Sequence, residues 1–86
     1  MYRLEYTVEA KEQIAHLPNE KIERQIQTAL SRLSEHPDIG KRLHGELKNL
    51  LAYRTGDYRI LYQVFHAEIR ILVVTLGDRK NIYKKL

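Results

Sequence analysis

The chain has 86 residues, 43% of them apolar, a length and composition typical of one compact domain, and we expect residues 1–86 to fold as a single domain. It contains no cysteine, which excludes disulfides, thiolate nucleophiles and cysteine-based metal sites. We expect a cytoplasmic protein without a membrane span or signal peptide. No run approaches the roughly 18 apolar residues that a span needs, and the opening MYRLEY lacks an apolar core.

The formal net charge of +4 is unevenly distributed along the chain. Residues 1–40 carry five basic and seven acidic side chains, whereas residues 41–86 carry ten basic and four acidic ones. Clustered lysines and arginines attract phosphates without reading sequence, so the second half is a candidate nucleic-acid-binding surface. Solubility alone is the alternative explanation of such a charge excess.

The first half of the chain predicts a strand and two helices. Residues 2–6 alternate apolar and polar side chains, as a half-buried strand does. Thr7 is a suitable N-cap for a first helix that Pro18 closes, and Asn19 is a suitable N-cap for a second helix that ends before Pro37. The second helix has apolar residues at helical spacing, namely Ile22, Ile26, Ala29, Leu30 and Leu33.

The second half predicts a loop followed by three strands. Residues 37–46 contain Gly40 and Gly45 and show no hydrophobic period, which favours a loop. The last of the three strands is apolar on both faces, which predicts an interior position in the sheet, and Gly77 is expected to end it. The predicted strands cover residues 50–54, 58–65 and 69–76.

The order of elements is therefore β-α-α-β-β-β. Such an order predicts an α+β fold in which two N-terminal helices pack on one face of a small antiparallel sheet.

Several chemistries receive no support from the sequence. Motifs for binding nucleotides or dinucleotides and for a hydrolase nucleophile elbow are missing. The four histidines do not fall at metal-ligand spacing, so we expect no metal and no other cofactor. Most carboxylates lie in the helical half, where a solvated helix face explains them better than an acid–base pair.

Two arginines are candidates for phosphate chemistry. Arg59 lies in the middle of a predicted strand, and Arg79 follows the next strand, so an antiparallel layout can bring both to one phosphate. Guanidinium groups stay protonated and bind phosphate oxygens through two parallel hydrogen bonds. The alternative is that both are structural, with Arg59 paired to Glu46 or Asp57 and Arg79 paired to Asp78.

A family resemblance adds to this interpretation. Residues 43–50 (LHGELKNL), 53–62 (YRTGDYRILY), 76–79 (LGDR) and 82–83 (IY) resemble the RelE toxins of the RelE/ParE superfamily of bacterial and archaeal toxin–antitoxin systems. The resemblance extends over nearly the whole chain. It implies a RelE-like fold with room for a short C-terminal helix.

The resemblance also implies an activity. RelE-like toxins are ribosome-dependent mRNA endoribonucleases that cut the A-site codon without metal, through attack of a ribose 2′-OH on the adjacent phosphate. Arg59, Arg79 and Tyr83 match the family's catalytic positions. Two strand lysines of well-studied members correspond here to Leu50 and Ala52.

Partners follow from the same resemblance. A cognate antitoxin is expected, with operator DNA bound only indirectly through it. Two alternatives remain open: a ParE-like toxin that poisons DNA gyrase, and a non-catalytic nucleic-acid-binding module. The basic residues expected to contact mRNA or ribosomal RNA are Lys41, Arg42, Lys48, Arg54, Lys80, Lys84 and Lys85.

Overall fold

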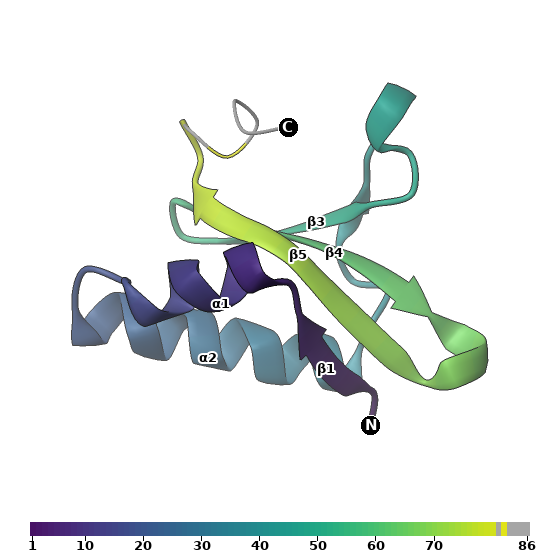
Figure 1. Ribbon diagram of the computed structural model, residues 1–86, viewed down its shortest axis with the longest axis horizontal. Helices are drawn as coiled ribbons and strands as arrows, with labels where there is room; N and C mark the ends of the chain where they lie inside the picture. Colours follow the sequence, from purple (N-terminus) through teal and green to yellow (C-terminus); the bar gives the residue numbers. More distant parts are fainter. Residues whose placement is uncertain (81, 83–86) are drawn as a thin grey trace.

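The computed structural model describes residues 1–80 and 82. Two helices lie on one face of a five-stranded sheet, which confirms the predicted α+β fold (Figure 1). None of the described helices has the length and apolar character needed to cross a membrane. The elements are β1 (Arg3–Tyr6), α1 (Val8–Ala15), α2 (Glu20–Glu35), β2 (Lys41–Arg42), the 3-10 turn η1 (Gly45–Leu47), β3 (Leu51–Thr55), β4 (Tyr58–Phe65), the 3-10 turn η2 (His66–Glu68) and β5 (Arg70–Asp78).

Both helices begin at the predicted N-caps. The Thr7 hydroxyl accepts a hydrogen bond from the Ala10 N–H at 3.0 Å, and the Asn19 side chain accepts one from the Ile22 N–H at 3.0 Å. These bonds satisfy backbone donors that have no partner within the first helical turn. α1 ends at Ala15, earlier than the predicted stop at Pro18, because the backbone leaves the helical region at the next residue.

The strand order is β1-β5-β4-β3-β2, and β5 is an interior strand as predicted. The expectation of a fully antiparallel sheet is wrong for one pair, because β1 runs parallel to β5. Alternating side chains identify a strand but do not choose its partner, and the helical segment after β1 lets the chain return in either direction. Nor does β5 end at Gly77, which still pairs with Arg59 of β4 before the strand ends at Asp78.

The predicted loop over residues 37–46 contains two short elements. Lys41 and Arg42 form β2, which pairs with β3, and the turn η1 follows at Gly45–Leu47. A two-residue strand is too short to show any hydrophobic period. Its conformation is imposed by pairing, with Lys41 opposite Ala52.

The core lies between the helices and the sheet. Side chains from α1 and α2 pack there against alternate residues of β3, β4 and β5. The opposite face of the sheet also contains buried side chains, including Leu61, and Ile82 packs over Gly77 on that side. The buried residues of the core are Ala10, Ile26, Ala29, Leu30, Leu33, Leu51, Ile60, Tyr62, Ile71, Val73 and Leu76.

Tyr62 links this core to the segment that leads into β2. Its side chain is fully buried, and its hydroxyl donates to the Pro37 carbonyl at 2.8 Å and accepts from the Gly40 N–H at 2.9 Å. Burial raises the pKa of the phenol to about 12. A Cβ at Gly40 would lie 2.5 Å from the hydroxyl, so only glycine allows this approach. The position of β2 therefore depends on a phenol in the core.

We expect Tyr62→Phe to lower the free energy of unfolding by about 1–3 kcal/mol, because two backbone groups lose their partner. Urea denaturation at pH 7 measures this loss. Tyr58→Phe is the matched control, since among the described residues the Tyr58 hydroxyl makes no hydrogen bond. Equal losses in both variants would contradict a specific role for the Tyr62 hydroxyl.

The same phenol predicts a dependence on alkaline pH. The unfolded chain releases the tyrosine proton near pH 10, whereas the folded protein keeps that of Tyr62 to about pH 12. A raised pKa in the folded state contributes stability below pH 10, and this contribution is lost as the pH rises towards 12. The unfolding free energy should therefore fall more steeply over this interval in the unaltered protein than in Tyr62→Phe.

Candidate nucleic-acid interface

Cationic side chains gather on the sheet face opposite the helices. On β4 the core takes Ile60 and Tyr62, so the alternation of the strand places Arg59 on the other face, as predicted. The residue directly across from Arg59 on β3 is Arg54, and the one on β5 is Gly77. Like charges directly opposite one another destabilise a sheet. An arrangement of this kind is typical of a surface that binds an anion.

Arg59 and Arg54 line a hollow of about 390 Å³. None of the described residues that line it is acidic. β2 contributes cations on one side, and the small side chain of Ala52 contributes to the lining on β3. The hollow therefore has the charge and donor groups to hold a phosphate. Its lining consists of Lys41, Arg42, Leu43, His44, Ala52, Arg54 and Arg59.

Arg59 has hydrogen-bonding capacity that the described residues leave unused. Its Nη1 atom is buried and has no hydrogen-bond partner among residues 1–80 and 82. Within this described part neither Glu46 nor Asp57 forms an ion pair with Arg59. The ion pair expected under the structural alternative is therefore not observed there. A buried donor without a partner costs free energy in the free protein.

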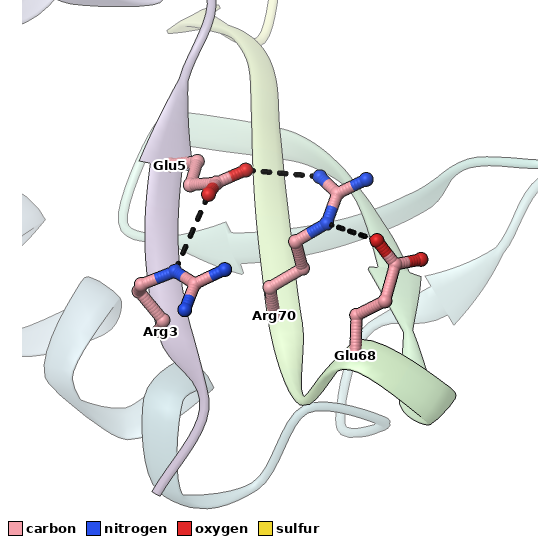
Figure 2. Close-up of polar contacts among 4 residues, drawn as sticks. All are labelled: Arg3, Glu5, Glu68 and Arg70. Atoms are coloured by element: carbon pink, nitrogen blue, oxygen red, sulfur yellow. Dashed lines mark hydrogen bonds and ion pairs between the residues drawn. The ribbon is translucent and has the colours of Figure 1, made fainter.

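Arg70, on the same face at the other end of β5, gives the contrast. Its guanidinium donates to Glu5 at 2.9 Å and to Glu68 at 3.0 Å, and Glu5 also accepts from Arg3 at 3.3 Å (Figure 2). It also lies over the Phe65 ring, 4.0 Å from the centroid. The hydrogen bond with Glu68 is the largest cause of the raised pKa of Arg70. The charge of Arg70 is thus balanced within the fold, whereas among residues 1–80 and 82 that of Arg59 has no acidic partner.

Arg79 lies in a different hollow from Arg59. Its hollow, of about 520 Å³, is lined by Asp57, Asp78, Arg79 and Lys80. The Arg79 backbone N–H donates to the Asp57 carbonyl at 2.7 Å, and its side chain forms no ion pair with Asp78 in the described structure. Because Gly77 is the residue opposite Arg59, Arg79 falls in the turn beyond the start of β4. The structure thus does not bring the two predicted arginines into one hollow.

The other predicted contact residues are placed as follows. Lys41, Arg42 and Arg54 share the hollow of Arg59, Lys80 shares that of Arg79, and the exposed Lys48 lines neither. Tyr83, Lys84 and Lys85 lie outside the described residues.

The sequence prediction missed three residues that line the hollow of Arg59, namely Leu43, His44 and Ala52. Ala52 is two residues before Arg54, and this strand period would have placed it on the same face. His44 follows β2 in a segment with no periodicity, so no local signal predicted its position.

Comparison with known proteins identifies the family of this small α+β protein. The family described as ParE toxin of type II toxin–antitoxin system, parDE, matches residues 4–83. The chain therefore belongs to the RelE/ParE superfamily of toxins from type II toxin–antitoxin systems.

Individual relatives agree with this assignment. The chain is 27% identical over 85 residues to Toxin RelG of Mycobacterium tuberculosis, covering 98% of both chains. It is similar to a chain in the crystal structure of the toxin–antitoxin complex RelBE2 from M. tuberculosis, with 26% identity, a TM-score of 0.80, and coverage of 91% of this chain and 98% of that one. The isolated Escherichia coli RelE toxin has the same fold, with a TM-score of 0.79, 22% identity, and coverage of 99% and 94%.

We expect Arg59→Met to leave the free energy of unfolding unchanged or to raise it. The substitution keeps an apolar stem but removes both an unpartnered buried donor and a charge opposite Arg54. Arg70→Met is the matched variant and should lower the free energy of unfolding, since the carboxylates of Glu5 and Glu68 lose their partner. Urea denaturation of both variants at low ionic strength measures the difference. Clear destabilisation by Arg59→Met would assign that arginine a structural role.

Proposed function

We propose that this toxin is a ribosome-dependent mRNA endoribonuclease that cleaves A-site codons. In the proposed reaction a ribose 2′-OH attacks the adjacent phosphate, and no metal takes part. The observation that carries the proposal is the hollow of about 390 Å³, with its cationic lining and the unpartnered Nη1 of Arg59.

The chemistry needs what this hollow offers. Negative charge builds up on the phosphate oxygens as the 2′ oxygen attacks, and donors that are already in place stabilise this charge most effectively. Arg59 is held by the sheet with a donor free among the described residues, and Arg54 stands directly across from it. Together they can grip two oxygens of one phosphodiester.

The proposed roles of the remaining residues follow the family's pattern. Arg79, in the neighbouring hollow, would contact the RNA beyond the scissile phosphate, and Tyr83 would stack on a base or take part in proton transfer. With Ala52 in place of a family lysine, the hollow gains space at β3 and loses a proton-transfer candidate.

We also propose the partners. Ribosomal RNA and mRNA phosphates would be held by Lys41, Arg42, Lys48, Arg54, Lys80, Lys84 and Lys85. A cognate antitoxin would neutralise the toxin, and operator DNA would be contacted only through that antitoxin. The similar M. tuberculosis RelBE2 structure is that of a toxin–antitoxin complex, which supports an antitoxin partner here.

Gyrase poisoning is the second candidate function. Two observations favour it: the matching family is described as ParE, and this chain has Leu50 and Ala52 where well-studied RelE toxins have lysines. The hollow of Arg59 favours the nuclease, because a cationic site that can hold a phosphate serves RNA cleavage directly.

The deciding experiment maps mRNA 5′ ends after brief expression of the toxin, with translation running and with translation blocked. We expect cuts within codons only when ribosomes are translating. DNA breaks or loss of supercoiling without such cuts would support gyrase poisoning. If the toxin produces neither mRNA cuts nor an effect on DNA, the non-catalytic binding module is the remaining interpretation.

Arg59→Met should reduce the single-turnover rate of mRNA cleavage on purified ribosomes by about 10²–10³-fold, as expected when one preorganised donor to a developing oxyanion is lost. Arg32→Met, on the exposed side of α2, is the control and should cut at the parental rate. An unchanged rate in Arg59→Met, with ribosome binding intact, would remove this arginine from the mechanism.

The basic face predicts a salt-dependent affinity for ribosomes. Each phosphate that the toxin neutralises should contribute about −0.7 to −0.9 to the slope of log affinity against log salt. Lys41→Gln should make that slope shallower by about one such step, whereas Lys21→Gln on α2 should not change it. Sedimentation or filter binding between about 50 and 200 mM KCl measures the slope. Identical slopes for the three proteins would show that Lys41 serves solubility.

A further inference from the structure

We infer that His44 is the general base that removes the proton from the attacking 2′-OH. The inference rests on the proposed nuclease function. It gives a role to one of the four histidines that the sequence analysis set aside as metal ligands, in a hollow where Ala52 stands in place of a family lysine.

The position of His44 supports this role. It lies between β2 and η1 and lines the same hollow as Arg59 and Arg54. Its backbone is extended, with φ −119° and ψ 169°, and its side chain does not cap the turn that follows. The residue is exposed, and in the described structure its ring nitrogens make no hydrogen bond. The imidazole is therefore available to a ligand that enters the hollow.

The other basic groups of the hollow are lysine and arginine side chains. Lys41 and Arg42 face it from β2, Arg54 from β3 and Arg59 from β4, and side chains of these two types are protonated at neutral pH. No carboxylate belongs to its described lining, although Glu46 lies nearby in sequence on η1. Histidine is the side chain that normally changes charge between about pH 5 and 8, which suits a general base.

The remaining histidines lie elsewhere. The His16 ring bonds the Glu12 carbonyl at 2.8 Å at the end of α1. The His66 ring lies between the Tyr2 hydroxyl, at 2.7 Å, and Asp38, at 3.2 Å. His36 lines a groove beside α2. His44 is thus the histidine that shares a hollow with Arg59 in the described structure.

The proposed step balances as follows. A ring nitrogen of neutral His44 takes the proton of the 2′-OH while the 2′ oxygen forms a bond to phosphorus. The bond between phosphorus and the 5′ oxygen breaks, and this oxygen takes a proton from water. The products are a 2′,3′-cyclic phosphate and a 5′-hydroxyl, and protonated His44 returns its proton to solvent.

The test compares the full chain with His44→Gln and His44→Ala in single-turnover cleavage of ribosome-bound mRNA from about pH 5 to 9, which spans the titration of histidine. We expect both variants to lose about 10²–10⁴ in rate, with ribosome affinity unchanged. The rate of the unaltered toxin should fall as the pH is lowered through the range in which histidine is protonated. His44→Gln should lack this fall, and added imidazole should restore part of the rate of His44→Ala.

The outcomes separate this inference from the proposed function. His16→Gln, whose ring is bonded at the end of α1, is the matched control and should keep the parental rate and pH profile. If the unaltered toxin cuts mRNA but His44→Gln cuts equally well with the same pH profile, the inference is wrong and the nuclease function stands. A loss confined to ribosome affinity would also overturn it. If the unaltered toxin does not cut, the proposed function fails and His44 has no proton to remove.

Discussion

The hydroxyl of Tyr62 is the contact on which the rest of the structure depends. A phenol at the centre of a hydrophobic core must satisfy its polar atom, and here the partners are the backbone groups of Pro37 and Gly40. These two bonds hold the segment between α2 and β2, and β2, with its two exposed cations, pairs with β3. The shape of the basic hollow therefore depends on a hydrogen-bonded side chain of the core.

The sheet face opposite the helices contains one arginine with acidic partners and one without such partners among the described residues. At one end Arg70 is neutralised by Glu5 and Glu68, and its charge contributes to the fold (Figure 2). At the other end Arg59 faces Arg54 and keeps a buried donor without a partner among the described residues. Such an arrangement destabilises the free protein, and a bound anion would reduce the repulsion between the two arginines. This contrast within one face is the reason that our proposal centres on Arg59.

The RelE/ParE fold does not by itself settle which target a toxin attacks, because one fold can carry different sites. The lining of the hollow carries more information. Ala52 leaves space where relatives are expected to have a lysine, and His44 adds a group that is able to accept a proton. We interpret these two differences together, as one site in which the proton acceptor comes from the loop after β2.

Short-range sequence patterns were enough to predict the local elements and the two faces of β4. The caps at Thr7 and Asn19, the helical period of α2 and the alternation through Arg59 are short-range patterns, and such patterns are written in neighbouring residues. Tertiary structure decided the parallel pairing of β1 with β5, the two-residue β2, and the separation of Arg79 from Arg59. It also decided that His44 enters the hollow. Each of these depends on contacts between segments far apart in the chain, for which no local period exists, and therefore only the folded protein reveals them.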